Sequence, residues 1–356
     1  MTKTIILAAG GTGGHVFPAI ALAQELKMRG YAPVLLTDHR IDKFANAIGI
    51  IPRHIIYAGK LSPKGLIHLL LGLVQSFLYF LKVKPVAVVG FGGYPSFPGM
   101  AMGLVLGIPT VLHEQNSYMG KANRLFAPFV KRVALSFPNT RAIPESAKTK
   151  CSMVGNPVRP AIKRLGKSVY SVSDDEIFLL ITGGSQGSSI FSEIIPPAIN
   201  QLPLFLQRKL RITQQCRPAE VAATQDFYNR NQIKAHVAAF INDMHMELAR
   251  ADLVIARAGA STCAELAVAG RPAILVPYPH ATEDHQTTNA RWLADAGAAI
   301  IIPQADLTPT ILANMLQNLL QSLENRSMMA QAAHNLGIPD AESALADLVE
   351  KYVKPS

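Results

Sequence analysis

Three glycine-rich turns, each directly following an apolar run, constrain this chain more than any other feature of its sequence. They lie in TIILAAGGTGGH (4–15), VAVVGFGGYPSFP (86–98) and IFLLITGGSQGS (177–188). A glycine cluster between the carboxyl end of a strand and a helix lets backbone N–H groups approach an anion, and the helix N-terminus adds partial positive charge. Two turns in the first half and one in the second predict two α/β domains facing each other, with phosphate chemistry in the cleft between them.

Length and composition indicate a globular, two-domain protein. The chain has 356 residues, of which 49% are hydrophobic and 16% charged, and this length suits two domains of ordinary size. Its three cysteines, Cys151, Cys216 and Cys263, show neither CxxC nor Cys/His spacing. This argues against a structural zinc site and a disulfide framework, and predicts a reducing compartment. The first predicted strand begins almost at once, which leaves no room for a signal peptide.

The charge is unevenly divided. Residues 1–155 hold 17 Lys and Arg against 5 Asp and Glu, whereas residues 156–356 hold 17 against 19. A split of this size predicts an anionic partner for the first half alone: nucleic acid, anionic lipid or a phosphorylated substrate. Nucleic acid is disfavoured, because the basic residues are scattered and no recognisable nucleic-acid-binding motif is present.

The hydrophobic pattern predicts alternating strands and helices in both halves. Continuous apolar runs predict parallel strands buried on both faces, at 4–9, 33–37, 86–90, 110–114, 177–181, 209–215, 236–240, 253–257 and 273–277. Helices are predicted near 15–29, 308–322 and 341–353, and a Pro-, Gly- and Ser-containing linker over 155–176. The predicted fold class is α/β, with two Rossmann-like, doubly wound parallel-sheet domains. We expect a first domain over 1–160 and a second over 161–340, with a C-terminal helix (341–356) packing back on the first.

One segment of the first half is intensely apolar: GLIHLLLGLVQSFLYFLK (65–82). It is flanked by four lysines, Lys60, Lys64, Lys82 and Lys84. It is too short for a transmembrane span and contains the polar residues His68, Gln75 and Ser76. Two interpretations remain: a core helix of the sheet, or an amphipathic helix whose exposed apolar face dips into a bilayer while the lysines meet anionic headgroups.

Several common phosphate-binding motifs do not fit the turns. In the first turn Gly11 and Gly13 have dinucleotide-binding spacing, but Val16 occupies the third glycine position. Asp38 ends the second predicted strand, where a ribose-binding acid would lie; the alternative is that it caps a turn. No GK[ST] follows any glycine cluster, which excludes a P-loop, and no GxSxG is present. Ser185 in GGSQG has no obvious base partner, which favours hydrogen bonding over nucleophilic attack.

Together, the motifs resemble one family in order and spacing over essentially the whole chain. They are GGTGGHVFP (10–18), GFGGYPSFP (90–98), LHEQN (112–116), GNPVR (155–159), GGSQG (183–187), RAGASTCAE (257–265) and HQTTNA (285–290). The family is the MurG family of bacterial cell-wall glycosyltransferases. The resemblance implies a two-domain GT-B fold and inverting transfer of N-acetylglucosamine from UDP-GlcNAc to the muramyl 4-hydroxyl of undecaprenyl-diphosphate-linked muramyl-pentapeptide (lipid I), forming lipid II. It implies no cofactor and no obligate metal.

The resemblance also implies a cellular role. It places the chain in peptidoglycan synthesis, and so in cell-wall biogenesis, cell shape and cell division, as a peripheral protein on the cytoplasmic face of the inner membrane. The implied partners are UDP-GlcNAc, lipid I, the anionic membrane surface and other cell-wall synthesis proteins, with no nucleic acid. Two rivals remain. A UDP-GlcNAc 2-epimerase shares the fold and the donor but does not need a basic, apolar-patched first domain. A nucleotide-sugar binding module would lack chemistry altogether.

The chemistry of glycosyl transfer suggests what the residues must do. A sugar hydroxyl attacks an anomeric carbon while a nucleotide diphosphate leaves, so the site needs a base and stabilisation of the leaving charge. The chain has no Asp-x-Asp motif to hold a divalent metal, so stabilisation is expected from helix N-termini, backbone N–H groups and an arginine. His15 opens a predicted helix, whose dipole favours a neutral imidazole that accepts a proton. It is the candidate general base; the alternative is a structural histidine.

The family resemblance assigns donor contacts residue by residue. They are Thr12, Gly13, Gly14, Asn116, Arg159, Ser185, Ile241, Ala260, Ser261, Thr262, Cys263, Ala264, Glu265 and Gln286. Within this set, 260–265 is expected around the uridine, with Glu265 on the ribose hydroxyls, Ile241 offering its backbone to uracil and Gln286 recognising GlcNAc. Sequence physics alone favours a different role for Glu265, a capping box with Thr262. The alternative for Arg159 is an exposed linker residue.

The second glycine turn has no donor role in this scheme. A second anion site in the basic half suits the lipid diphosphate of the acceptor, so Gly92, Gly93 and Tyr94 are candidate acceptor contacts, together with His113 and Glu114. The alternatives are that the turn merely lets a helix pack closely on the sheet, and that His113 and Glu114 are structural residues at a strand end.

Overall fold

The computed structural model describes residues 2–44, 48–59, 63–166, 170, 175–184 and 187–353. The chain divides into two compact units. The first comprises Met1–Arg159 and Ile338–Ser356, and the second comprises Pro160–Gly337. Each unit is built around one parallel sheet.

The first unit contains a seven-stranded parallel sheet in the order β3-β2-β1-β4-β5-β6-β7. Its strands are β1 (Thr4–Ala8), β2 (Ala32–Thr37), β3 (Arg53–Ile55), β4 (Ala87–Gly90), β5 (Thr110–Glu114), β6 (Arg132–Leu135) and β7 (Cys151–Met153). The strand order reverses between β1 and β4, which makes the carboxyl ends of these two strands the topological switch point where α/β sheets bind ligands.

Helices cover both faces of this sheet. They are α1 (Gly13–Met28), α3 (Pro63–Val83), α4 (Phe97–Val105), α5 (Lys121–Phe126) and α15 (Ala341–Glu350), with short 3₁₀ helices η1 (His39–Phe44), η2 (Tyr94–Ser96) and η3 (Glu145–Lys150). Ile5 and Leu7 of β1 join the core on the side of α1 and α15, whereas Ile6 joins the core on the side of α3, α4 and α5. Because successive strand residues point to opposite faces, burial on both sides produces the continuous apolar runs seen in the sequence.

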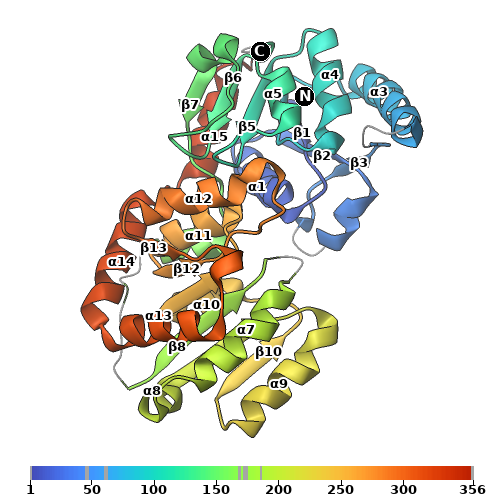
Figure 1. Ribbon diagram of the computed structural model, residues 1–356. Coiled ribbons are helices and arrows are strands. Elements are labelled where there is room, and N and C mark those ends of the chain that lie inside the picture. Colours follow the sequence, from blue (N-terminus) through green and yellow to red (C-terminus); the bar gives the residue numbers. More distant parts are fainter. Residues whose placement is uncertain are drawn as a thin grey trace. The chain divides into compact units, whose positions relative to one another are not determined.

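Helix α15 returns to the first unit from the end of the chain, where it packs beside α1 and β6 (Figure 1). Leu345 and Val349 are fully buried in the same core as α1. At the surface, Arg29, the C-cap residue of α1, pairs with Asp347 at 2.5 Å and with Glu350 at 2.6 Å. The helix is therefore an integral part of the first unit rather than an appended tail. Residues 354–356 lie outside the described residues.

The second unit repeats the architecture with a six-stranded parallel sheet, in the order β10-β9-β8-β11-β12-β13. Its strands are β8 (Ile177–Thr182), β9 (Leu210–Gln215), β10 (Ala235–Ala238), β11 (Leu253–Ala256), β12 (Ala273–Leu275) and β13 (Ala299–Ile301). Its helices are α6 (Pro160–Leu165), α7 (Ser189–Asn200), α8 (Leu204–Lys209), α9 (Val221–Arg230), α10 (Met244–Arg250), α11 (Ala260–Ala269), α12 (His285–Ala294), α13 (Pro309–Gln321) and α14 (Leu323–Leu336), with η4 (Pro218–Glu220), η5 (Thr282–Asp284) and η6 (Gln304–Asp306). Here the order reverses between β8 and β11.

The predicted fold class is confirmed, and each predicted strand is present. The strands are often shorter than their apolar runs: the run at 236–240 ends as a strand at Ala238, and the run at 273–277 ends at Leu275. Four strands escaped prediction, namely β3, β6, β7 and β13. The sequences of β3 (RHI) and β7 (CSM) contain no apolar run. β6 (RVAL) and β13 (AII) do contain apolar residues and were overlooked.

Helix α3 contradicts two expectations. The core-helix interpretation is wrong, because only 17% of an 18-residue stretch within Gly65–Val83 is buried. The 19 residues of Gly65–Val83, with a mean hydropathy of 1.8, also meet the length and composition needed to cross a membrane, so the helix is not too short. A narrow face containing Gly72, Ser76 and Phe80 is buried and the helix packs on α4; a Cβ at Gly72 would lie 2.0 Å from the carbonyl oxygen of Tyr57.

The remaining surface of α3 carries eight exposed hydrophobic side chains. They are Leu66, Ile67, Leu70, Leu71, Val74, Phe77, Leu78 and Leu81, which we call the α3 apolar face. Lys82 and Lys84 are exposed at the end of the helix. Lys60 lies outside the described residues, as does the side chain of Lys64.

Burial of α15 predicts that Leu345→Ala destabilises the first unit. Removing a fully buried leucine side chain leaves a cavity and should lower the free energy of unfolding by about 2–4 kcal/mol. Urea denaturation of the full chain measures the loss. Leu78→Ala is the control, because Leu78 is 59% exposed in the same unit and its truncation should cost little. Equal losses in both variants would contradict a core role for α15.

Candidate active site

Two glycine turns meet at the carboxyl edge of the first sheet. β1 and β4 are hydrogen-bonded neighbours, with Ala8 opposite Gly90, so the turns that follow them lie side by side. Gly11, Gly92 and Gly93 have φ angles of 92°, 81° and 71°, a region that favours glycine. The sheet topology therefore combines two distant sequence motifs in one site.

His15 connects these turns. It is the third residue of α1, whose N-cap, Thr12, makes no side-chain capping bond. A Cβ at Gly93 would lie only 3.2 Å from the His15 ring, so the ring packs on the second turn. Its Nδ1 lies 3.3 Å from the carbonyl oxygen of Gly10. Because a carbonyl only accepts, Nδ1 carries the proton and Nε2 carries the lone pair, which is the tautomer that a general base requires.

His113, at the end of β5, is fully buried. Its Nε2 donates to the carbonyl oxygen of Gly155 at 3.0 Å, and its Nδ1 accepts from Gln115 at 2.9 Å. Burial lowers the pKa of His113 to about 4; the Gly155 hydrogen bond opposes this shift, and protonation of nearby His15 would add to it. The ring is therefore neutral at physiological pH. Of the two roles expected for His113, this geometry favours the structural one.

Glu114 is buried beside it and accepts four hydrogen bonds. They come from the backbone N of Asn116 at 3.0 Å, the Asn116 amide at 3.4 Å, the backbone N of Gly120 at 2.9 Å and the Asn123 amide at 2.8 Å. Burial raises the pKa of Glu114, while these bonds oppose the shift. The loop after β5 wraps around this carboxylate, which also orients Asn116, a predicted donor contact. Its geometry likewise favours the structural role.

Sequence reasoning missed Asn123, which joins this loop to the second glycine turn. The side chain is 2% exposed, and its amide donates to the carbonyl oxygen of His113 at 3.1 Å as well as to Glu114. A Cβ at Gly92 would lie 3.1 Å from that amide. No motif marked Asn123, because its importance follows from the neighbouring positions of β4 and β5.

Asp38 is engaged within the protein. Its carboxylate lies 2.6 Å from Nη2 of Arg40 and accepts the backbone N–H of Arg40 at 3.2 Å. Of the two roles considered for Asp38, the structure therefore supports the turn-forming one. At the end of the first unit, the Arg159 guanidinium lies 5.6 Å from the centre of the Phe17 ring on α1, so it does not extend into solvent like a linker residue.

The third glycine turn follows β8 in the second unit. β8 pairs with β11, with Thr182 opposite Ala256, so this turn lies beside the RAGAST segment. A Cβ at Gly183 would come within 2.5 Å of the backbone N of Ser188, which makes glycine necessary there. Ser185, the predicted diphosphate contact, lies outside the described residues.

Arg257, a second residue that sequence reasoning missed, organises this edge. Its guanidinium donates to Ser188 Oγ at 2.9 Å and Gln304 Oε1 at 2.6 Å, and to the carbonyl oxygens of Val276 and Pro277 at 3.1 and 3.0 Å. Burial lowers its pKa. One side chain thus ties together the segments after β8, β12 and β13. The RAGAST motif signalled the position but not this role.

The predicted uridine segment forms the start of α11. Its N-cap is Gly259, without a side-chain capping bond; Thr262 lies inside the helix, so the expected capping box with Glu265 is wrong. Ala260, Cys263 and Ala264 are buried, whereas Ser261, Thr262 and Glu265 are half-buried. Burial raises the pKa of Cys263 to about 12, which keeps it a thiol. The hydroxyl of Ser261 is itself buried, so Thr262 and Glu265 are the polar side chains of this segment that remain partly exposed.

Gln286 and Ile241, two further predicted donor contacts, lie at the same edge of the second sheet. Gln286 is in the first turn of α12, and its Oε1 accepts the backbone N–H of Tyr278 at 2.9 Å. Asn289, one turn later and fully buried, donates to the carbonyl oxygen of Ala258 at 3.2 Å and so joins α12 to the RAGAST segment. Ile241 is 8% exposed and follows β10, so any ligand contact there would involve mainly its backbone.

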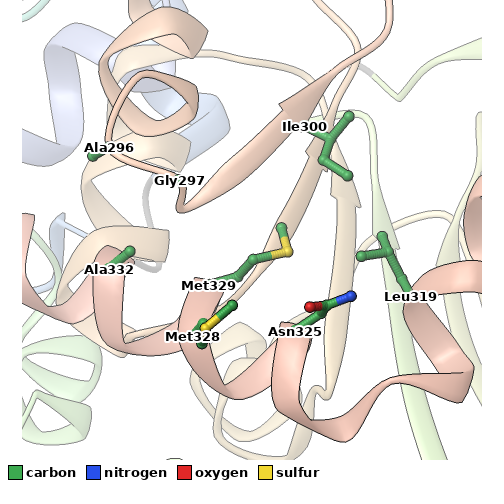
Figure 2. A pocket seen from close by; sticks show the side chains of 8 residues that line it. All are labelled: Ala296, Gly297, Ile300, Leu319, Asn325, Met328, Met329 and Ala332. Atoms are coloured by element: carbon green, nitrogen blue, oxygen red, sulfur yellow. The ribbon is translucent and has the colours of Figure 1, made fainter.

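A pocket of about 370 Å³ lies elsewhere in the second unit (Figure 2). It is lined by Ala296, Gly297, Ile300, Leu319, Asn325, Met328, Met329 and Ala332. Figure 2 shows Met329 reaching from α14 toward Ile300 of β13. The lining has one polar side chain, that of Asn325, and no charged one. Ala296 and Gly297 of the lining precede β13, so the pocket lies at the amino edge of the sheet. It therefore contains none of the predicted site residues and does not suit a diphosphate.

The described residues also bear on metal binding. Among residues 2–44, 48–59, 63–166, 170, 175–184 and 187–353, no group of three or more His, Cys, Asp or Glu side chains is arranged to hold a metal ion.

Comparisons with known proteins match the whole chain. Residues 5–135 match the glycosyltransferase family 28 N-terminal domain and residues 178–350 match the C-terminal domain of that family. A Rhodospirillum centenum protein named as a UDP-N-acetylglucosamine–N-acetylmuramyl-(pentapeptide) pyrophosphoryl-undecaprenol N-acetylglucosamine transferase is 44% identical over 353 residues, covering 97% of this chain and 93% of the relative.

Solved structures also match this chain over nearly its whole length. The crystal structure of MurG from Acinetobacter baumannii superimposes with a TM-score of 0.81 at 35% identity, covering 98% of this chain and 99% of that one. A UDP-N-acetylglucosamine 2-epimerase structure from Listeria monocytogenes matches with a TM-score of 0.66 at 14% identity, covering 96% and 94%. The epimerase likeness shows a shared fold alone.

The buried neutral His113 predicts a specific pH dependence of stability. Its pKa in the folded chain, about 4, is below the ordinary value of about 6.5, so the unfolded chain takes up a proton first as the pH falls. The neutral His113 ring therefore makes its full contribution to the free energy of unfolding above pH 6.5. This contribution declines toward pH 4, by up to about 3 kcal/mol.

His113→Gln keeps a donor for Gly155 but removes this titration. The stability difference between wild type and variant, measured by urea denaturation, should therefore narrow as the pH falls from 7.5 to 4.5. His236→Gln is the control, because His236 is exposed on β10 and should change stability little at either pH. A constant difference for His113→Gln would contradict the assignment of a neutral, buried ring.

Proposed function

The chain belongs to glycosyltransferase family 28 and, within it, to the MurG N-acetylglucosaminyltransferases, and we propose that it transfers N-acetylglucosamine from UDP-GlcNAc to the muramyl 4-hydroxyl of undecaprenyl-diphosphate-linked muramyl-pentapeptide. The geometry of His15 is the observation that carries this proposal. The ring packs on Gly93, with its Nδ1 proton directed to Gly10. A base of defined tautomer thus lies at paired glycine turns.

In the proposed reaction, the muramyl 4-hydroxyl attacks the anomeric carbon of the donor sugar. Its proton passes to Nε2 of His15 as the new C–O bond forms, the bond between the anomeric carbon and the diphosphate oxygen breaks, and UDP leaves with the bonding electrons. Attack from the side opposite the leaving group inverts the anomeric centre. Held at the N-terminus of α1, where positive charge is disfavoured, His15 starts neutral and can accept the proton.

We propose that the second unit binds the donor. The start of α11 has no side-chain cap, so its backbone N–H groups, together with the glycine turn after β8, would stabilise the leaving diphosphate. Arg257 holds Ser188 at the end of that turn. Glu265 is half-buried on α11 and suits the ribose hydroxyls, while Gln286 suits the sugar. Ser185, Ile241 and the other donor contacts implied by the resemblance remain predictions.

We propose that the first unit binds the acceptor and docks on the membrane. The basic charge of this unit fits a lipid diphosphate, and Gly92, Gly93 and Tyr94 form the turn beside His15. The α3 apolar face, with exposed Lys82 and Lys84 after it, is suited to lie in the headgroup region of an anionic bilayer as a peripheral anchor. This would hold the enzyme at the cytoplasmic face, where it would serve peptidoglycan synthesis, and thereby cell shape and division, beside other cell-wall proteins.

One assay separates this function from its rivals. The purified chain is incubated with labelled UDP-GlcNAc and a short-chain lipid I analogue, and UDP and the disaccharide product are measured. We expect equal amounts of both. Formation of the C2 epimer of the donor would instead support an epimerase, and donor binding without turnover would support a binding module.

Two variants should divide catalysis from donor binding in this assay. His15→Ala removes the base and should lower kcat by about 10²–10⁴-fold, while titration with UDP-GlcNAc gives an unchanged Kd. Glu265→Ala should do the reverse, weakening donor binding about tenfold or more through the loss of a charge-assisted hydrogen bond. Full turnover by His15→Ala would overturn the base assignment, and unchanged donor affinity in Glu265→Ala would overturn the ribose contact.

The membrane proposal predicts selective vesicle binding. Val74→Ser and Leu78→Ser should each weaken co-sedimentation with anionic phospholipid vesicles, because they remove apolar area from the α3 apolar face. Met28→Ser is the control, since Met28 is 77% exposed outside that face. Added salt should also weaken binding. Equal binding of the wild type to neutral vesicles would contradict the electrostatic contribution.

A further inference from the structure

Arg40 is a charged side chain at the glycine turns that the proposed mechanism leaves without a role. It lies in η1, directly after β2. Its Nε donates to the two carboxylate oxygens of Asp38 at 3.2 and 2.9 Å, and its Nη2 lies 2.6 Å from Oδ2. The centre of its guanidinium is 4.4 Å from the centre of the Tyr94 ring. A carboxylate and an aromatic ring thus hold the guanidinium in one orientation.

The position of Arg40 relates it to both turns. β2 is the neighbour of β1, so η1 starts at the same sheet edge as the first turn. A Cβ at Gly11 would lie 3.4 Å from Nη2 and 3.7 Å from Nη1, which means that the guanidinium rests on the glycine backbone. Tyr94 belongs to the second turn, whose Gly93 contacts the His15 ring. Arg40 and His15 therefore lie on the same pair of turns.

The guanidinium retains unused hydrogen-bonding capacity. Asp38 takes Nε–H and one edge of Nη2, while Nη1 has no hydrogen-bond partner among the residues that the structure describes. The side chain is 36% exposed. A planar guanidinium binds phosphate through two parallel N–H groups. Because Arg40 is already oriented, little additional side-chain entropy would be lost on binding.

We propose that Arg40 binds a phosphate of the acceptor's diphosphate through Nη1, with Asp38 and Tyr94 as positioning residues. This inference rests on the proposed transferase function. The acceptor is the source of this phosphate because Arg40 belongs to the basic first unit, whereas the turn after β8 in the second unit suits the donor diphosphate. The Arg40–Asp38 pair is neutral overall, so recognition depends on directed N–H donors rather than on net charge.

The test is a double cycle that compares two enzymes, wild type and Arg40→Met, on two acceptors, one with and one without the diphosphate. Wild type and Arg40→Met are assayed with a short-chain lipid I analogue and with an alkyl glycoside of the same muramyl-pentapeptide. In this glycoside, called the neutral glycoside, an uncharged alkyl group replaces the lipid diphosphate. It is tested as a substrate or as a competitive inhibitor of the lipid I analogue. We expect Arg40→Met to lower kcat/KM for the diphosphate acceptor about tenfold or more. The neutral glycoside should be affected less than twofold, and so should the KM for UDP-GlcNAc.

Two further variants sharpen the test. Arg53→Met is the matched control, because Arg53 lies on β3 of the same unit and pairs with exposed Asp42 at 3.4 Å; it should leave both acceptors almost unaffected. Arg40→Lys retains the charge without the fork and should recover only part of the loss. Thermal unfolding of each variant monitors folding, and if Arg40→Met does not fold, Arg40→Lys and Asp38→Asn provide the same comparison.

Each outcome decides the proposal. An equal loss with both acceptors would show a purely structural role for Arg40, and a raised KM for UDP-GlcNAc would assign the phosphate to the donor; either result overturns the inference. An equal loss in Arg53→Met would show general attraction by the basic unit and also overturn it. If wild type forms no disaccharide from the diphosphate acceptor, the transferase function itself fails, whereas transfer without selectivity in the cycle refutes only the role of Arg40.

Discussion

The pairing of β1 with β4 is the contact on which the first unit's site depends. Ala8 lies opposite Gly90, so two turns about eighty residues apart in the chain emerge side by side. This adjacency places the His15 ring on Gly93 and the Arg40 guanidinium between Gly11 and Tyr94. A side chain at these glycines would push the two motifs apart. Parallel pairing at the topological switch point thus creates the site, and the glycines permit its close approach.

Both units stabilise the carboxyl edge of their sheet in the same way. Glu114 in the first unit and Arg257 in the second are buried, ionisable and surrounded by hydrogen-bonding partners. Each fastens loops from several strands, and each acts through neighbours: Glu114 through Asn116, and Arg257 through Ser188. A buried charge with all its partners in place is rigid, and losing a partner is costly.

Local sequence predicted local structure well where the signal was long. The run TIILA became β1, and the glycine turns formed where the apolar runs ended. Prediction failed where local chemistry allowed two outcomes. Thr262 and Glu265 have capping-box spacing, but α11 begins earlier, at Ala260 after Gly259. The composition of 65–82 suited a core helix, yet most of α3 is exposed, because only its narrow face containing Gly72 and Phe80 packs on the unit.

The sequence by itself determined the strand–turn–helix units, the parallel α/β class and the motifs that resemble the family, because these depend on residues near one another in the chain. Tertiary structure alone decided which turns meet, that Asp38 holds Arg40, and that Asn123 and Arg257 organise the two edges. Such contacts depend on strand order, which no local pattern encodes. The glycine turns therefore predict an anion site, and the packing of neighbouring strands decides which side chains lie beside those turns.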